Sequence, residues 1–571
     1  MSTRRGFIQS SSALAATLAF DGLKSTLAQE SNTALRPNVI FILADDMGYS
    51  DIGCYGSEVD TPNLNALAET GLRFSNFYNN PRCCPSRASL MTGLYSHQVG
   101  FALMADNYGE IPYPAYKGDL SSNCVTVAEA LRSGGYRTAM TGKWHLTPPM
   151  LESKHNWPLQ RGFERFYGTI AGACSYYDPA TLTDGNERVR AGKDFYYTDA
   201  IGDHAVKYID EFTSEGEQNP FFLYAAFTAP HWPLQAPEGV INKYIERFSM
   251  GWDQIRANRH SRQIEMGLLP EKWALTERDL RVPPWQLAAH KEWEIRRMAV
   301  YAAQIECLDH NIGKIVAELK MKGAYENTLI LFMSDNGGNL EELSEPGPLA
   351  NAPIFIPHET ADGRPVRAGN NPNIMPGGPD TYQSIGIPWG NVANTPFRMY
   401  KHYTQEGGIS TPFIAHWPAG IQLGKNAITH QVGHETDVMA TLLDLAHTSY
   451  PKERDGNPVL PTVGTTLVPV FSGKPRAERT YFWEHEGNAA VRIGKWKLVS
   501  AYPNYWQLYD MEADRTELHD LADQYPDRVG QMATAYKKWA SMVGVEPWPV
   551  TGISSRVPGV MPYLRRDNQL D

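Results

Sequence analysis

Cysteine is scarce in this chain. Six cysteines occur among 571 residues, at positions 54, 83, 84, 124, 174 and 307. No two of them have the Cys-x-x-Cys spacing of a zinc ribbon, and six are too few for a disulfide framework in so long a chain. The sequence therefore predicts neither a zinc ribbon nor a disulfide-built fold.

Positive charge and long apolar runs are also in short supply. Lys and Arg number 52 against 63 Asp and Glu, and the formal net charge of −11 argues against nucleic acid as a partner. An acidic protein can still bind an anion through a local group of basic residues. Beyond residue 28 no stretch approaches the uncharged length of a membrane span. With 42% apolar residues, the chain can nevertheless build a large core.

The first 28 residues have the features of an export signal. Arg4-Arg5 forms a twin-arginine pattern, the apolar stretch Ala13–Phe20 follows it, and Leu27-Ala28 offers a small-residue cleavage point. This resembles a bacterial twin-arginine signal; the alternative is a disordered basic N-terminus. We therefore expect the twin-arginine translocase as a partner, no membrane span, and a periplasmic or secreted protein.

Four apolar runs, 38–44, 136–141, 221–227 and 328–333, have the composition of strands buried on both faces. Helical patterns alternate with them, as between residues 291 and 319, which favours a parallel sheet covered by helices. Short alternating strands appear after residue 480, followed by a helix at 526–543. We predict an α/β fold: a large mixed, mainly parallel sheet sandwiched by helices, with a smaller C-terminal antiparallel α+β subdomain.

The domain boundaries follow from shifts in composition. We predict the export signal at 1–28, a main domain at 36–449, a linker at 450–479, the α+β subdomain at 480–550 and a tail at 551–571. The segment from about 341 to 394 is rich in Pro, Gly and Asn and has little periodicity. We interpret it as a long loop packed over the mouth of a site; a mobile surface insertion is the alternative for its middle part.

The stretch from Cys83 to Gly93 joins a predicted strand, 72–78, to a helix. Pro85 suits the first turn of a helix and Gly93 can end it, so Cys83 lies at or just before the N-terminus, with Arg87 one turn on. A helix N-terminus can activate a cysteine, and a nearby Arg can bind an anion. This suits a nucleophile facing a sulfate or phosphate group. The alternative is a buried structural cysteine.

Each predicted central strand is followed by polar residues, at the edge where open α/β sheets place their ligands. Two of these groups are acidic: Asp45 and Asp46, and Asp335 with Asn336. Three carboxylates and one amide oxygen form a hard-cation set that suits Ca²⁺ or Mg²⁺ better than Zn²⁺. The alternative for Asp45-Asp46 alone is a pair of solvated turn acids.

Five basic residues, spread along the chain, could ring an anion. They could hold its non-bridging oxygens and protonate a leaving oxygen. Each is weak alone, because a single Lys or His after a strand is usually polar surface. The set comprises Arg87, Lys143, His145, His231 and Lys401.

Together these motifs resemble one family. Cys83-x-Pro85-x-Arg87 followed by Leu90-x-Thr92-Gly93 is similar to the signature of the formylglycine-dependent type I sulfatases, in the alkaline phosphatase-like superfamily. The acidic pairs, Gly142-Lys143-Trp144-His145 and Lys401 with Glu406-Gly407-Gly408 resemble the remaining motifs in the same order. The likeness runs from about Asn38 to about Arg528 and is nearest to bacterial arylsulfatases. Cys84 departs from the usual small polar residue.

The resemblance implies a mechanism for hydrolysis of sulfate esters. A maturation enzyme would convert Cys83 to Cα-formylglycine, whose hydrate is the nucleophile and also a metal ligand. Asp45, Asp46, Asp335 and Asn336 would hold Ca²⁺, with Mg²⁺ as the alternative, and Asp335 would take the nucleophile's proton. His231 and Lys401 would assist the leaving oxygen, His145 the elimination of sulfate, and Lys143 and Arg87 would hold the aldehyde hydrate. Because twin-arginine export carries folded proteins, we expect Cys83 to be modified in the cytoplasm, before folding.

Two rival functions remain open at this point. A phosphodiester or phosphonate monoester hydrolase of the same superfamily would share the formylglycine and metal chemistry. A non-catalytic, metal-stabilised binding protein with a degenerate site is the second, although Cys83, Arg87 and His231 are all present. The sequence does not select among an aryl sulfate, a sulfated sugar and a sulfated polysaccharide.

Overall fold

The computed structural model describes residues 36–107, 109, 111–214, 219–344 and 354–553. From Pro37 onward these residues form one compact unit. The predicted export signal lies outside the described residues, as does nearly all of the predicted tail. Among the helices that the structure describes, none combines the length and apolar character needed to cross a membrane.

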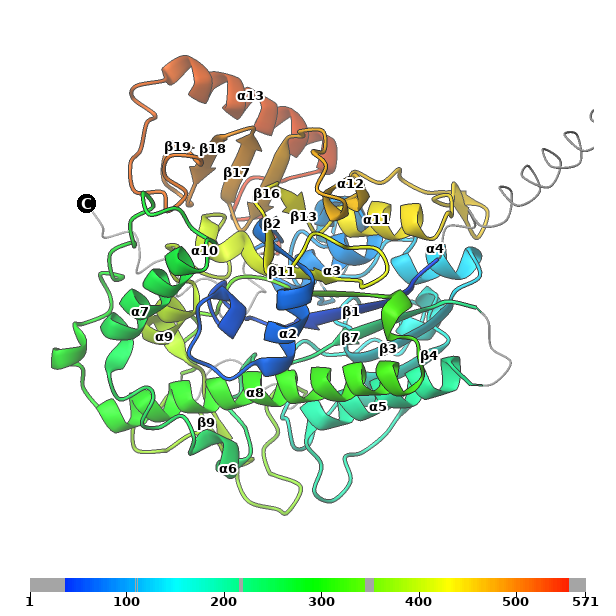
Figure 1. Ribbon diagram of the computed structural model, residues 1–571, viewed down its shortest axis with the longest axis horizontal. Helices are drawn as coiled ribbons and strands as arrows, with labels where there is room; N and C mark the ends of the chain where they lie inside the picture. Colours follow the sequence, from blue (N-terminus) through cyan, green and yellow to red (C-terminus); the bar gives the residue numbers. More distant parts are fainter. Residues whose placement is uncertain (1–35, 108, 110, 215–218, 345–353, 554–571) are drawn as a thin grey trace, which may run out of the picture. The chain divides into compact units, whose positions relative to one another are not determined.

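A large mixed sheet runs through this unit (Figure 1). Its strand order is β12-β2-β11-β8-β1-β7-β3-β4-β5-β6, with β13 beside β2. The four central strands, β8, β1, β7 and β3, are mutually parallel, whereas β11 runs antiparallel to β8. Their bounds are Thr328–Ser334, Asn38–Ala44, Phe221–Ala226 and Arg137–Lys143. The predicted α/β class with a mainly parallel sheet is confirmed.

The remaining strands of the sheet extend it on both sides. They are β2 (Leu72–Tyr78), β4 (Arg165–Thr169), β5 (Leu182–Asp184), β6 (Glu187–Arg188), β11 (Ser410–His416), β12 (Ala427–Thr429) and β13 (Gly433–His434). Two short pairs lie outside it: β9 (Arg367–Ala368) with β10 (Thr381–Tyr382), and β14 (Glu453–Arg454) with β15 (Asn457–Pro458).

Helices cover both faces of the sheet, and β1 shows why. Successive side chains of a strand point to opposite faces: Ile40 and Ile42 belong to one apolar core, Phe41 and Leu43 to the other. The first core packs under α2 (Pro62–Thr70), α5 (Tyr197–Phe212) and α8 (Lys291–Met321), and the second under α3 (Cys83–Thr92), α4 (Val127–Ser133) and α11 (Asp437–Leu445). Figure 1 shows α8 and α5 side by side along one face.

The segment 341–394 differs from the predicted structureless loop. It contains β9, β10 and a helix, α9 (Gly386–Ala393). Glycines and a proline make this segment a poor helix former, but burial compensates: Trp389 is fully buried and packs edge-on against Trp252 of α7 (Gly251–Glu265). Tertiary packing, which no local pattern reveals, stabilises α9. Three further short helices are α6 (Glu238–Ile241), α10 (Glu406–Ile409) and α12 (Val468–Phe471).

The C-terminal part forms the predicted antiparallel sheet with its helix. Its strands are β16 (Tyr481–His485), β17 (Asn488–Ile493), β18 (Trp496–Ser500) and β19 (Gln507–Asp510), paired in that order, and α13 (Pro526–Val543) packs on β17 and β18. Buried Glu406 ties this sheet to the main one, because its carboxylate pairs with Lys497 of β18 at 2.8 Å and accepts a bond from Tyr78 of β2 at 2.9 Å.

Candidate active site

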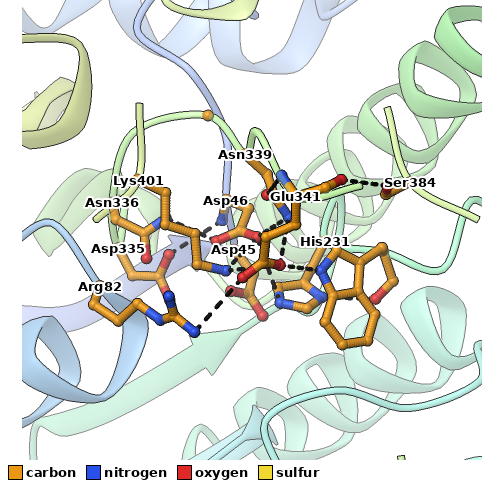
Figure 2. A network of polar contacts seen from close by, with 12 residues as sticks. Asp45, Asp46, Arg82, His231, Asp335, Asn336, Asn339, Glu341, Ser384 and Lys401 are labelled. Atoms are coloured by element: carbon orange, nitrogen blue, oxygen red, sulfur yellow. Dashed lines mark hydrogen bonds and ion pairs between the residues drawn. The ribbon is translucent and has the colours of Figure 1, made fainter. Parts of the chain in front are cut away.

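Four neighbouring strands deliver the predicted polar residues to one edge of the sheet. Because β8, β1, β7 and β3 are adjacent and parallel, their carboxyl ends lie together. The residues at or just beyond these carboxyl ends are Asp335 and Asn336, Asp45 and Asp46, His231, and Lys143 with His145. The structure brings all of them together with Arg87 and Lys401, and Figure 2 shows the part of this network around Asp46.

Asp45 pairs with the cations from β3 and α3. Its Oδ2 lies 2.6 Å from Lys143 Nζ and 3.7 Å from Arg87 Nη2, and all three side chains are fully buried. Burial raises the pKa of Asp45 to about 6, although Lys143 and Arg87 oppose the shift. The two cations therefore offset only part of the effect of burial on this carboxylate.

Asp46 has a left-handed backbone, with φ of 63°. Its Oδ2 accepts hydrogen bonds from Lys401 Nζ at 2.8 Å and Asn339 Nδ2 at 3.0 Å, and its Oδ1 accepts one from Asn336 Nδ2 at 2.7 Å. Burial would raise the pKa of Asp46, but Lys401 and then His231 outweigh it and hold that pKa below its usual range.

Asp335 is held by Arg87 from the helix that begins at Cys83. Arg87 Nε and Nη2 contact Asp335 Oδ2 at 3.0 and 2.9 Å, while Arg87 Nη1 donates to the Lys143 carbonyl at 2.9 Å. The Asp46 backbone N–H donates to Asp335 Oδ1 at 3.1 Å. Burial, followed by the charge of Asp45, raises the pKa of Asp335 to about 8.

Cys83 is the first residue of α3, as its position before Pro85 predicts. Arg82 occupies the N-cap position, and Gly93 ends the helix in the left-handed conformation at φ 68°. The Cys83 side chain is buried. A hydrogen bond from Cys84, together with the charges of Lys143 and Lys401, outweighs burial and holds the pKa of the Cys83 thiol well below its ordinary value.

Two histidines flank this cysteine. His145 lies close enough to hydrogen-bond the Cys83 side chain, and its Nδ1 is buried with no hydrogen-bond partner among the described residues. His231 Nδ1 lies 2.6 Å from the Trp232 carbonyl oxygen, which leaves Nε2 facing Asp46 Oδ2 at 3.4 Å. Burial lowers the pKa of His145 to about 3 and of His231 to about 4.

The donor set fits a hard divalent cation. Asp45 Oδ1 and Asn336 Oδ1 are buried, and neither has a hydrogen-bond partner within the described part of the chain. Ligand atoms of Asp45, Asp46 and His231 lie within 4.8 Å of one another. Carboxylate and amide oxygens are the ligands of Ca²⁺ and Mg²⁺. A cation there would also balance the negative charge of the buried carboxylates.

Sequence reasoning missed four residues of this neighbourhood. Arg82, Trp232, Asn339 and Glu341 all join the network: Asn339 donates to Asp46 Oδ2, and Glu341 lies 3.7 Å from Lys401 Nζ. Glu341 also accepts a hydrogen bond from Trp232 Nε1 at 2.5 Å. Asn339 and Glu341 closely follow Asp335-Asn336, and that nearness was the one available signal.

Comparison with known proteins bears on the identity of this site. A model of the sulfatase family matches residues 37–448. The chain belongs to the sulfatase family. A second model, described as the C-terminal part of N-sulphoglucosamine sulphohydrolase, matches residues 397–538. The chain is thus a sulfatase-type hydrolase of sulfate esters, and the alternative of a non-catalytic binding protein is set aside.

Individual relatives of this sulfatase cover most of its length. An uncharacterised sulfatase of Schizosaccharomyces pombe is 32% identical over 556 residues, which is 91% of this chain and 96% of that protein. An arylsulfatase of Klebsiella aerogenes is 33% identical over 461 residues, 78% of this chain and 94% of that one. The crystal structure of Ps i-CgsB superposes with a TM-score of 0.62 at 25% identity, covering 90% and 94% of the two chains.

Proposed function

We propose that this sulfatase uses a formylglycine hydrate derived from Cys83, with a bound divalent cation, to split sulfate esters into an alcohol or phenol and inorganic sulfate. The position of Cys83 carries the proposal. It begins α3, it is buried, and His145, Lys143 and Lys401 surround its side chain. An anion at this place would meet the helix N-terminus and two ammonium groups.

The surrounding residues fit both groups. Asp45, Asp46, Asp335 and Asn336, together with the modified residue 83, would hold Ca²⁺, with Mg²⁺ as the alternative. The cation supplies charge that polarises the sulfate and the nucleophile, and the aldehyde hydrate supplies one hydroxyl for attack and a second from which sulfate can be expelled. Two of the protein ligands hold a buried oxygen that the described hydrogen bonds leave unused.

The protein's own side chains then have distinct tasks. Arg87 fixes Asp335, which takes the nucleophile's proton, and Lys143 fixes Asp45. Lys401 Nζ and His231 Nε2 face the same oxygen, Asp46 Oδ2, so both can serve the departing alcohol oxygen from one side. His145, on the Cys83 side, assists the release of sulfate. Burial of the whole set excludes water from the charged groups.

Turnover of 4-nitrophenyl sulfate by protein made in a host with a formylglycine-generating enzyme tests this proposal. We expect Cys83→Ala to reduce kcat by about a thousandfold or more, because it removes the nucleophile. Cys307→Ala is the matched control: Cys307 lies in α8, in the apolar core on the other face of the sheet, so this variant should keep turnover.

The same assay distinguishes a sulfatase from the rival function, a phosphodiester or phosphonate monoester hydrolase. Faster hydrolysis of bis(4-nitrophenyl) phosphate than of 4-nitrophenyl sulfate by the matured protein would assign the site to that rival. Equal activity of wild type and Cys83→Ala on the sulfate ester would refute the role of Cys83.

We also propose that the twin-arginine translocase exports this sulfatase to the periplasm or the medium. Arg4-Arg5 and the apolar stretch after it support this proposal.

A further inference from the structure

A second group of potential metal ligands lies where the C-terminal sheet meets the segment that carries Lys401. Ligand atoms of His402, His485 and Glu486 lie within 4.8 Å of one another. The side chains of His485 and Glu486 are 0% and 1% exposed, and that of His402 is 14% exposed. None of the three belongs to the cation site at Asp45, so this cluster needs an explanation of its own.

The β16–β17 hairpin supplies two of the three potential ligands. His485 pairs with Asn488 across the hairpin, so Glu486 and Gly487 form its two-residue turn, with φ of 54° and 81°. Such a turn favours Asn, Asp or Gly in its first position, because both of its residues need a left-handed backbone. A glutamate is unusual in that position, and here its side chain is buried rather than exposed to solvent.

His485 and Glu486 each bury an atom that lacks a partner. The Ala102 carbonyl oxygen, which can only accept, lies 3.1 Å from His485 Nδ1. Nδ1 therefore carries the proton of the neutral ring, and Nε2 keeps a lone pair. This Nε2 lies 3.4 Å from Glu486 Oε1, and neither atom has a hydrogen-bond partner among the described residues. Two buried lone pairs at this separation repel each other unless a cation binds both.

The chemistry and spacing of these atoms suit zinc. At zinc–ligand distances of about 2.0–2.1 Å, tetrahedral ligands lie about 3.4 Å from one another. His485 Nε2 and Glu486 Oε1 have this separation, and Glu486 Oε2 lies 2.9 Å from His402 Nδ1. Two imidazoles and a carboxylate are a zinc donor set, whereas Ca²⁺ prefers oxygen ligands alone. A ligating histidine commonly donates its other N–H to a backbone carbonyl, as His485 does to Ala102.

Arg82 contacts the same histidine and would compete with a metal ion. Its Nη1 lies against the ring nitrogens of His402, while its Nη2 lies 3.6 Å from Glu341 Oε1. A metal ion on His402 would displace Nη1 from the ring. Because Glu341 lies beside the guanidinium, Arg82 would still have an anionic partner after this exchange.

We propose that His402, His485 and Glu486 form a zinc site that fastens the segment carrying Lys401 to the C-terminal sheet. His402 directly follows Lys401, and it lies 84 residues before Glu486 in the chain. An ion bound to all three ligands therefore cross-links the two segments. The site lies outside the proposed sulfate-ester chemistry, and it does not depend on the modification of Cys83.

Calorimetric titration with zinc chloride tests this proposal. The full chain is first treated with a chelator and then kept in excess Ca²⁺, which fills the site at Asp45. We expect the wild type to bind one zinc ion per chain at the proposed site. In Glu486→Gln, which keeps the shape of the side chain but loses its charge, zinc affinity should fall about 100-fold or more, because loss of even an outer partner of a ligand costs about 10- to 100-fold.

Two further variants make the result specific. Glu484→Gln is the matched control, because Glu484 is also buried in β16 but pairs with His97, at 2.7 Å, and should leave zinc affinity unchanged. His402→Gln is the second ligand variant, and its partly exposed position limits any damage to packing. Zinc should raise the Tm of wild type and Glu484→Gln, but not that of Glu486→Gln or His402→Gln.

Three results would overturn the zinc site. They are no zinc binding by the Ca²⁺-loaded wild type, wild-type zinc affinity in both ligand variants, and an equal loss of affinity in Glu484→Gln. None of these measurements uses turnover of a sulfate ester, so failure of the proposed function and failure of the zinc site are separate findings.

Discussion

Asp45 and Asn336 each bury one oxygen atom for which the described residues provide no hydrogen bond. Leaving a buried polar atom without a partner costs about 1–3 kcal/mol, and a cation bound to these two oxygens would offset that cost. Both atoms belong to residues whose other polar atoms are engaged, Asp45 Oδ2 by Lys143 and Asn336 Nδ2 by Asp46. At the scale of single residues, a hard cation is the partner that fits these oxygens best.

Removal of one such ligand should weaken metal binding selectively. We expect Asn336→Ala to lower the Ca²⁺ affinity of the chelator-treated protein by about 10- to 100-fold in calorimetric titration, because an oxygen ligand is lost. The rise in Tm on adding Ca²⁺ should shrink in parallel. Asn311→Ala, in helix α8, is the control for removing a buried Asn. Unaltered Ca²⁺ affinity in Asn336→Ala would show that Asn336 is not a ligand.

The individual residues show what sequence reasoning can reach at this scale. All ten predicted site residues lie in the same network. Nine of them lie at the end of a strand, shortly after one, or in the first two turns of α3, all of which have patterns visible in the sequence; Lys401, in the irregular stretch 394–405, is the exception. Arg82, Asn339 and Glu341 could not be predicted. They lie in irregular segments, where periodicity gives no information about the direction of a side chain.

Some helices and strands could be predicted from local signals in the sequence, and others could not. β1 and α13 have the predicted bounds, Asn38–Ala44 and Pro526–Val543, because apolar runs and a proline at a helix start are local signals. The helices α5, α7 and α9 were not predicted. α7 carries many charged residues, among them Arg259, which is fully buried and pairs with Asp51 at 2.7 Å. Such a charged helix looks solvent-exposed until its partners are known.

The short helix α10 joins two sheets through Glu406, and this contact should make stability depend on pH. Burial would raise the pKa of Glu406, but Lys497, Arg515 and Arg492 lower it to about 2, below the usual value of 4.5. A depressed folded-state pKa stabilises the protein above pH 4.5, and this contribution is lost as the pH falls from about 4.5 to about 2.

We therefore expect Glu406→Gln to be less stable than wild type by about 3 kcal/mol at neutral pH in urea unfolding, because buried cations lose their partner. The difference should narrow as the pH falls below about 4.5. Glu69→Gln removes an exposed pair with Lys425 and should change stability little. If the difference in unfolding free energy between wild type and Glu406→Gln stays constant down to pH 3, the lowered pKa of Glu406 is contradicted.

At the scale of the whole molecule, the burial of Cys83 constrains when it can be modified. Its side chain is 1% exposed, inside a compact unit that begins at Pro37. A maturation enzyme needs access to this residue, and export by the twin-arginine route carries folded proteins. Given the modification and the export route proposed above, we expect conversion to precede both folding and export.

This order can be tested with a precursor that stays in the cytoplasm. We expect Arg4→Lys with Arg5→Lys to block export, and the retained, folded precursor to carry the aldehyde at residue 83 already. The wild-type chain in the same host gives the exported reference. A retained precursor with an unmodified thiol, beside exported protein that carries the aldehyde, would contradict modification before export.

The mass of the peptide that contains residue 83 tests the central claim most directly. The protein should come from a host with a competent maturation enzyme and be digested without reducing treatment of the aldehyde. We predict the mass of formylglycine at residue 83, with Cys84 in the same peptide left as a thiol. An unmodified thiol at residue 83 in protein that nevertheless hydrolyses 4-nitrophenyl sulfate would contradict the account.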